Sequence, residues 1–231
     1  MMQQEDWNAI DHVLLDMDGT LLDKHFDDYF WEQYLPEHYS LLHGISIRQA
    51  RSALLARYRQ VENTLAWTDL NYWSQELGLD IPALKKNIDH LIQIHPGVIE
   101  FLVFCRNSGK HLALVTNAHS TTLTIKLEKT GLDSWFDDII CAEATGYAKE
   151  QKDFWNTLSH HLTFDPTRTL FADDSETVLA TAATGSNIRH LIHIARPSSR
   201  KQPTYSRRFT SICSFRELMP ADNLSPPIIS A

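Results

Sequence analysis

The chain has 231 residues, of which 43% are hydrophobic and 22% charged, and its formal net charge is −8. This composition suits a globular protein with one core domain and an insertion, and it excludes a largely disordered chain. The negative charge disfavours a nucleic acid polymer as partner, whereas a few local cations suffice to bind a small phosphorylated metabolite.

The three cysteines, Cys105, Cys141 and Cys213, are scattered and form no CxxC pair. We therefore expect neither a disulfide framework nor a zinc site. The first eleven residues contain no basic side chain, and every apolar run is too short to cross a bilayer. The sequence thus predicts a cytoplasmic protein with no signal peptide and no membrane partner.

Five short apolar runs, bounded by polar or turn residues, are typical of strands buried on both faces of a parallel sheet. They span residues 13–15, 112–115, 139–141, 169–172 and 191–195. Helical patterns lie between them, over residues 96–105, 120–131, 150–162 and 175–183. This alternation predicts an α/β fold with a doubly wound, Rossmann-like parallel sheet and right-handed crossovers. Ligands of such folds bind at the carboxyl ends of the strands.

Residues 24–95 interrupt the alternation, because they contain helical patterns but no strand-like run. Ser46 is placed to cap one helix, and a second helical piece ends near Gly78. We predict an all-helical cap domain at residues 24–95, inserted into a core domain formed by residues 1–23 and 96–220. Residues 221–231 are predicted to be a flexible tail.

Asp16 and Asp18 follow the first strand in the segment DMDGT, residues 16–20. Two carboxylates this close at a strand end can converge on Mg²⁺, which prefers hard oxygen ligands. Gly19 permits the sharp turn that the chain needs there. Taken alone, the segment is also compatible with a simple acidic turn.

Three further polar groups occur at later positions, Thr116-Asn117, Lys149 and Asp173-Asp174. Each has an ordinary explanation, since Thr116 could cap a helix, Lys149 could be a solvated lysine, and the acidic pair could favour a helix N-terminus. Their order at successive strand ends instead favours one shared site.

The order DxDGT, Thr, Lys, Asp-Asp resembles the four motifs of the haloacid-dehalogenase-like hydrolases, and the resemblance covers nearly the whole chain. The helical insertion is similar to the cap that one subfamily carries after its first strand. Segments 13–31, 70–80 and 169–176 resemble the bacterial GMP/IMP nucleotidases most closely. The resemblance implies a Mg²⁺-dependent phosphatase that acts on a nucleoside monophosphate, most specifically GMP or IMP.

The resemblance also implies roles for single residues. Asp16 would attack phosphorus to form an aspartyl-phosphate, and Asp18 would act as general acid and then as general base. The metal ligands would be Asp16, Asp174 and the main-chain carbonyl of Asp18.

Thr116, Asn117 and Lys149 would hold the phosphate and offset its charge. Two departures from the family pattern matter here. Glu150 follows Lys149 where Pro is common, so Lys152 is the alternative cation. Val178 stands where many members have a further acid, a supporting role that Asp173 could fill.

The predicted cap is rich in aromatic residues, on which a purine base could stack. Candidates for substrate binding are Tyr29 and Trp31 above all, together with Trp67, Tyr72 and Trp73. The ordinary alternative is that these side chains form the core of the cap itself.

Other functions remain as alternatives. A sugar-phosphate phosphatase or a phosphomutase would use the same residues. A halide-removing enzyme would not need the acid at Asp18. A receiver-like, non-enzymatic phospho-switch also combines Asp, Thr and Lys, but it has its phosphoacceptor later in the chain and lacks an insertion of this size. The chain has no GxxxxGK[ST], GxGxxG, HExxH or GxSxG motif.

Overall fold

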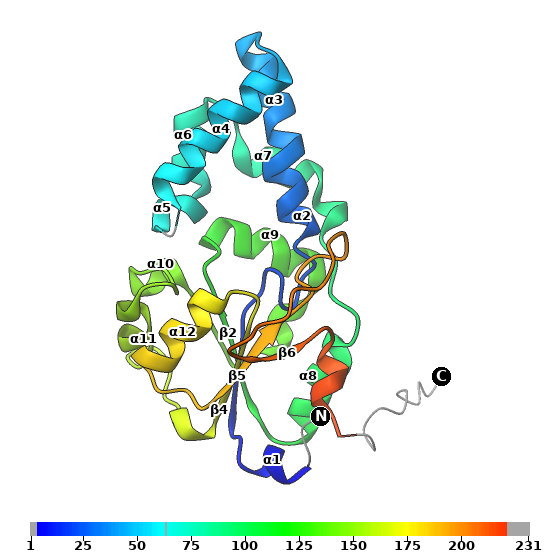
Figure 1. Cartoon of the computed structure of the whole chain (residues 1–231), viewed down its shortest axis with the longest axis vertical. Coiled ribbons are helices and arrows are strands. Elements are labelled where there is room, and N and C mark those ends of the chain that lie inside the picture. Colours follow the sequence, from blue (N-terminus) through cyan, green and yellow to red (C-terminus); the bar gives the residue numbers. More distant parts are fainter. Residues whose placement is uncertain (1–3, 63, 221–231) are drawn as a thin grey trace.

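The computed structural model describes residues 4–62 and 64–220. Figure 1 shows helices α2 to α7 gathered at one end of an elongated molecule, and the sheet with its flanking helices at the other end. The predicted tail at residues 221–231 lies outside the described residues. No helix of the described part is long and apolar enough to span a membrane.

Six parallel strands form one sheet in the described part of the chain, in the order β3-β2-β1-β4-β5-β6. The strands are β1 (His12–Leu15), β2 (His111–Thr116), β3 (Asp138–Cys141), β4 (Thr169–Asp173), β5 (His190–Ile194) and β6 (Thr210–Ile212). The predicted doubly wound α/β fold is confirmed, with all five predicted strands. Sequence reasoning missed β6, a three-residue edge strand. The strand order reverses between β1 and β4, where folds of this type bind ligands.

Side chains of the central strands alternate between two apolar layers. Val13 and Leu15 face one layer, which includes Trp7 and Phe101, whereas Leu14 faces the other. All of these side chains are fully buried. Burying each large apolar side chain contributes roughly 1.5–3 kcal/mol, so the strand runs hold the sheet between two cores.

Helices cover both faces of the sheet (Figure 1). They are α1 (Gln4–Asn8), α8 (Val98–Asn107), α9 (Ser120–Thr130), α10 (Ala142–Thr145), α11 (Lys152–Leu158) and α12 (Glu176–Gly185). Short 3-10 helices span Leu132–Trp135, Pro166–Arg168 and Phe215–Leu218. The helix predicted over 150–162 is shorter than expected, and the four-residue α10 was missed.

The segment from residue 24 to residue 95, here called the helical insertion, contains helices and no strand of the sheet among its described residues. Ser46 and Gln49 form a capping box that begins α4, and Gly78 ends α6 in the left-handed conformation, as predicted. The elements are α2 (His25–Tyr29), a π-helical turn (Phe30–Tyr34), α3 (Leu35–His43), α4 (Ile47–Val61), α5 (Leu65–Thr68), α6 (Leu70–Leu77), α7 (Ile81–Asn87) and a 3-10 turn (Asp89–Leu91).

Candidate active site

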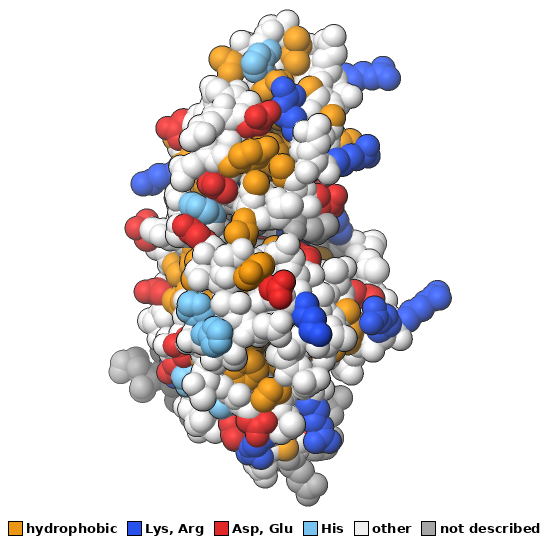
Figure 2. Space-filling model, turned by 90° about the vertical axis from the view of Figure 1, so that its left-hand side faces the viewer, with side chains coloured by type: hydrophobic (Ala, Val, Ile, Leu, Met, Phe, Trp, Pro, Cys, Tyr) orange, Lys and Arg blue, Asp and Glu red, His pale blue; other side chains and the backbone are white. Residues whose placement is uncertain are grey.

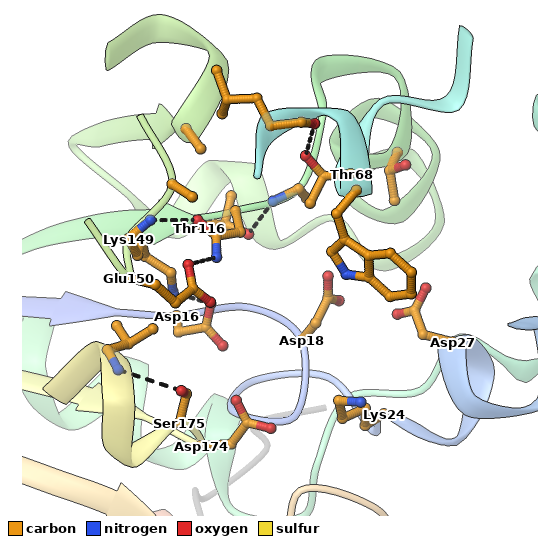
Figure 3. A pocket seen from close by; sticks show the side chains of 18 of the residues that line it. Asp16, Asp18, Lys24, Asp27, Thr68, Thr116, Lys149, Glu150, Asp174 and Ser175 are labelled. Carbon is orange, nitrogen blue, oxygen red and sulfur yellow. Dashed lines mark hydrogen bonds and ion pairs between the residues drawn. The ribbon is translucent and has the colours of Figure 1, made fainter. Parts of the chain in front are cut away.

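A cavity of about 370 Å³ lies between the carboxyl ends of the strands and the helical insertion. Figure 3 shows Asp16, Thr116, Lys149 and Asp174 on its sheet side and Asp27 on the side of the insertion. The lining includes Asp16, Asp18, Thr116, Asn117, Lys149, Asp173 and Asp174, so these predicted residues share one site. The helical insertion contributes Lys24, Asp27, Trp31, Glu62, Thr64, Leu65, Trp67, Thr68, Leu70 and Lys85.

Lys149 forms the centre of a buried group of ion pairs with Asp16 and Asp173. Lys149 Nζ lies 2.5 Å from Asp16 Oδ1 and 2.7 Å from Asp173 Oδ2. Burial disfavours the lysine charge, but the two carboxylates outweigh burial and raise the pKa of Lys149 above its usual value. Lys149 therefore carries a permanent positive charge beside the oxygen atoms of Asp16.

The main chain of Lys149 is fixed on both sides. Its N–H donates to Asn117 Oδ1 at 2.8 Å, and its carbonyl accepts from Trp155 Nε1 at 2.8 Å. Lys152, the alternative cation, is exposed at the start of α11. The geometry therefore puts Lys149, rather than Lys152, beside Asp16.

Thr116 and Asn117 follow β2 directly. Thr116 Oγ1 accepts a hydrogen bond from the Ala118 N–H at 3.0 Å, which bends the chain at the strand end. Asn117 Nδ2 donates to Glu150 Oε2 at 2.9 Å. Asn117 thus ties the loop after β2 to the loop that carries Lys149, in addition to lining the cavity.

Three carboxylates form a candidate metal site. Asp16, Asp173 and Asp174 each offer an oxygen, and these oxygens lie within 4.8 Å of one another. Asp173 already accepts from Lys149 and from the Ser175 N–H, whereas the described residues donate no hydrogen bond to the Asp174 carboxylate.

Electrostatics supports a cation at these carboxylates. Burial, followed by repulsion from Asp173 and Asp16, raises the pKa of Asp174 well above its usual value. Burial also raises the pKa of Asp173 to about 7, although Lys149 acts in the opposite direction. A divalent ion would relieve this repulsion. The carboxylate oxygens are hard donors and carry negative charge, and both properties fit Mg²⁺.

The predicted metal ligand Asp18 turns its side chain away from this cluster. Asp18 Oδ1 lies 2.5 Å from Lys126 Nζ, across the cavity floor from Asp174. The side chain of Asp18 is therefore not part of the candidate metal cluster. Burial raises the pKa of the Asp18 carboxyl, which Lys126 opposes and the charge of Asp27 reinforces.

Lys126, Asp27 and Lys85 were not predicted as site residues. Lys126 bridges Asp18 and Asp27, and Lys85 pairs with Asp27 at 2.7 Å. The sequence contains one indication that Lys126 has a buried partner. Lys126 follows Leu123 by three positions, on the buried face of α9, where a lysine needs a partner.

The structure places some of the predicted aromatic residues at the cavity and others away from it. Trp31 and Trp67 line the cavity, with ring centroids 5.6 Å apart and planes at 28°. Tyr29 is not among the lining residues, because helical positions two apart do not share a face, and its ring packs on Tyr34 instead. Trp73 is fully buried in the helical insertion, as the alternative interpretation predicted for such residues.

Comparison with known proteins gives a consistent result. The family model described as haloacid dehalogenase-like hydrolase matches residues 10–185. A curated protein from Escherichia coli (strain K12), the GMP/IMP nucleotidase YrfG, is 38% identical over 215 residues, which cover 93% of this chain and 96% of that protein.

Solved structures share the fold. A HAD phosphatase from Thermococcus onnurineus superposes with a TM-score of 0.74 at 24% identity, covering 90% of this chain and 96% of that chain. An L-2-haloacid dehalogenase from Xanthobacter autotrophicus has a TM-score of 0.58 at 17% identity, with coverage of 90% and 96%. The family match over most of the sequence, together with the assembled motifs, shows that the chain belongs to the haloacid dehalogenase-like hydrolases.

Proposed function

We propose that this enzyme is a Mg²⁺-dependent nucleotidase that hydrolyses purine nucleoside 5′-monophosphates, GMP and IMP, through an aspartyl-phosphate on Asp16. The observation that carries the proposal is the placement of Asp16, whose carboxylate lines the cavity and is paired with Lys149 and flanked by Asp174. The identity of 38% to the Escherichia coli nucleotidase supports the substrate.

The first chemical step forms a bond between an Asp16 oxygen and phosphorus, while the bond from phosphorus to the leaving oxygen breaks. Asp16 Oδ1 is held by Lys149, which leaves Oδ2 as the attacking atom. The Lys149 charge offsets the negative charge that Asp16 and the phosphoryl group bring together. Thr116 and Asn117, on the same side of the cavity, line the space for the phosphoryl oxygens.

Asp18 gives its proton to the leaving ribose oxygen in this step. In the second step it takes a proton from the water that attacks phosphorus, and Asp16 is regenerated. Both residues line the cavity, but Asp16 is paired with Lys149 and Asp18 with Lys126, so the two carboxyl groups reach the phosphoryl group from different sides.

Mg²⁺ would be held by Asp16, Asp174 and the main-chain carbonyl of Asp18, and when bound it reduces the repulsion between an anionic nucleophile and an anionic substrate. Asp173 keeps a supporting role, because both of its carboxylate oxygens already accept hydrogen bonds from Lys149 and the Ser175 N–H.

The helical insertion acts as a cap in this proposal, and its lining supplies the base site. Trp31 and Trp67 offer aromatic faces above the catalytic residues. Stacking of a base on such rings contributes roughly 1–3 kcal/mol in known systems. Glu62 and Thr64 add polar groups that line the same side of the cavity.

The surface charge and the cysteines bear on the partner and the cellular compartment of this enzyme. On the face shown in Figure 2, acidic and basic side chains are interspersed, which fits a small phosphorylated metabolite better than a nucleic acid polymer. All three cysteines are free thiols, which supports a reducing, cytoplasmic location.

The test is phosphate release from a panel containing GMP, IMP, AMP and several sugar phosphates, with and without Mg²⁺. We expect GMP and IMP to give the highest kcat/KM, Mg²⁺ to be required, and Asp16→Asn to abolish release. Trp67→Ala should raise KM for GMP more than KM for a sugar phosphate, whereas Tyr72→Ala, outside the cavity, should change neither. Preference for a sugar phosphate would retain the mechanism and overturn the nucleotide assignment. Transfer of the phosphoryl group from Asp16 to a second hydroxyl of a sugar phosphate, with little free phosphate formed, would identify a phosphomutase instead.

A further inference from the structure

Four alternating charges connect the sheet with the helical insertion. Asp18 Oδ1 lies 2.5 Å from Lys126 Nζ, which in turn lies 2.6 Å from Asp27 Oδ2. Asp27 Oδ1 then lies 2.7 Å from Lys85 Nζ. The four residues come from the loop after β1, from α9, from α2 and from α7.

Both lysines of this chain are buried, with Lys126 1% exposed and Lys85 2% exposed. An ammonium group out of water is strongly unfavourable unless it is paired. Aromatic rings supply much of the remaining surroundings, since the Lys85 Nζ lies 5.0–5.4 Å from the ring centroids of Phe26, Phe30 and Trp31. The lysines therefore depend on the two aspartates, and the aspartates on the lysines.

Lys126 is the single hydrogen-bond partner of the Asp18 carboxylate within the described residues. Because one contact fixes this side chain, the direction in which Asp18 points depends on where Lys126 Nζ lies. The position of Lys126 Nζ is in turn fixed by Asp27, which belongs to the helical insertion. An ammonium group has three donors in a compact arrangement, so it can serve both carboxylates at once.

We propose that Lys126 is a positioning residue that aims the Asp18 carboxyl at the leaving oxygen, with Asp27 as the group of the helical insertion that holds Lys126 in place. The inference rests on the proposed role of Asp18 as general acid. It assigns a function to a lysine on α9 that belongs to none of the four motifs. It also makes correct placement of the insertion a condition for proton donation.

The two possible roles of Lys126, positioning Asp18 or only supporting the fold, predict different dependences of the rate on the leaving group. A ribose 5′-oxygen is a poor leaving group and needs the proton of Asp18, whereas p-nitrophenolate leaves without one. The parameter to compare is kcat/KM, because it excludes the later hydrolysis of the phosphoenzyme, which is common to both substrates. The variants are Lys126→Met, Asp27→Asn and Asp18→Asn, with Lys129→Met as the matched control on the exposed side of α9.

We expect Lys126→Met to lower kcat/KM for GMP by about 10²-fold and that for p-nitrophenyl phosphate by less than about threefold. Asp18→Asn should show the same selective loss, Asp27→Asn a smaller loss with the same selectivity, and Lys126→Arg a partial recovery. Lys129→Met should match the wild type on both substrates. If Lys126→Met does not fold, Asp27→Asn is used in its place. The side-chain oxygen of the new asparagine can still accept one hydrogen bond from a buried lysine.

Equal losses on the two substrates, or no loss on GMP, in a folded Lys126→Met protein would overturn the positioning role. If the wild type does not hydrolyse GMP, the comparison uses the alkyl phosphate that it hydrolyses best, and only the substrate assignment fails. If Asp18→Asn lacks the selective loss, the general-acid role fails and this inference fails with it.

Discussion

Gly19 lies so close to Asp174 that a β-carbon on Gly19 would stand 2.6 Å from the Asp174 carboxylate. The φ angle of Gly19 is +87°, in the left-handed region that favours glycine. Its N–H closes the turn by donating to the Leu22 carbonyl at 2.8 Å. Gly19, the third residue after Asp16, therefore sets how closely the loop of Asp16 and Asp18 approaches the carboxylate of Asp174.

We predict that Gly19→Ala lowers kcat/KM by about 10²-fold, because the new methyl group displaces Asp174 by a distance comparable to 1 Å. Gly109→Ala is the matched control, since Gly109 also has a positive φ, of +67°, but has no atom within 4 Å of the added carbon. Both variants should lose roughly 1–2 kcal/mol of unfolding free energy in urea titrations. Full activity of Gly19→Ala would show that the close approach has no functional role.

The second prediction concerns Lys149, which is paired with Asp16. Lys149→Met leaves Asp16 and Asp173 buried without their shared partner, and we expect a loss of about 3–5 kcal/mol of stability. Phosphate release should fall by about 10²–10³-fold, because the positive charge at the phosphoryl group is lost. Lys152→Met is the control, and it should stay within about 0.5 kcal/mol of the wild type. Loss of activity in Lys152→Met alone would assign the role to Lys152.

Metal binding can be measured without activity. Mg²⁺ at about a hundredfold its Kd should raise the melting temperature by about 5–10 °C, because only the folded chain brings Asp16 and Asp174 together. Asp174→Asn removes one of three repelling carboxylates, so the metal-free variant should melt at a higher temperature than the metal-free wild type. The same variant should lose most of the Mg²⁺ effect. A full Mg²⁺ effect in Asp174→Asn would place the ion elsewhere.

The fourth prediction concerns pH and His95, which joins the helical insertion to the sheet. His95 Nε2 donates to the Pro197 carbonyl at 3.1 Å. Burial lowers the pKa of His95, although nearby Asp23 acts in the opposite direction. Because the pKa is lower in the folded chain than in the unfolded chain, the unfolded chain binds the proton first as pH falls below about 6.5.

The contribution of neutral His95 to stability is therefore complete above that pH and decreases as pH falls toward the folded-state pKa. His95→Gln cannot take up this proton. We expect the difference in unfolding free energy between wild type and His95→Gln to become smaller from about pH 7.5 to about pH 5.5, as measured by urea titration. A difference that grows on acidification would show that the charged form is the one stabilised by Asp23.

Much of the fold could be predicted from the sequence for a simple physical reason. The strands β1, β2 and β4 are buried on both faces, so each contains an unbroken apolar run that stands out, at residues 13–15, 112–115 and 170–172. The edge strand β6 has the sequence Thr-Ser-Ile with an exposed first residue, so it carries no such signal. Capping residues such as Ser46 and Gly78 marked helix ends correctly, because their hydrogen bonds are local.

The residues of the candidate site also differ in whether a local sequence pattern reveals their position. Asp16, Thr116 and Asp174 could be predicted to converge, because the carboxyl ends of parallel strands meet at one edge. The partnership of Lys126 with Asp27 could not, since it joins residues 99 positions apart on two helices whose relative placement no local pattern encodes. Tyr29 and Trp31 were treated alike, but only the packing of the insertion decides which ring faces the cavity.

The most direct test of the account is to identify the phosphorylated residue during turnover. GMP carrying a radiolabelled phosphate is mixed with enzyme and Mg²⁺, the reaction is quenched in acid within milliseconds, and the labelled peptide is sequenced by mass spectrometry. We expect label on Asp16, loss of that label as free phosphate forms, and no labelled protein with Asp16→Asn. Rapid phosphate release with no labelled protein, or label that persists in Asp16→Asn, would contradict it.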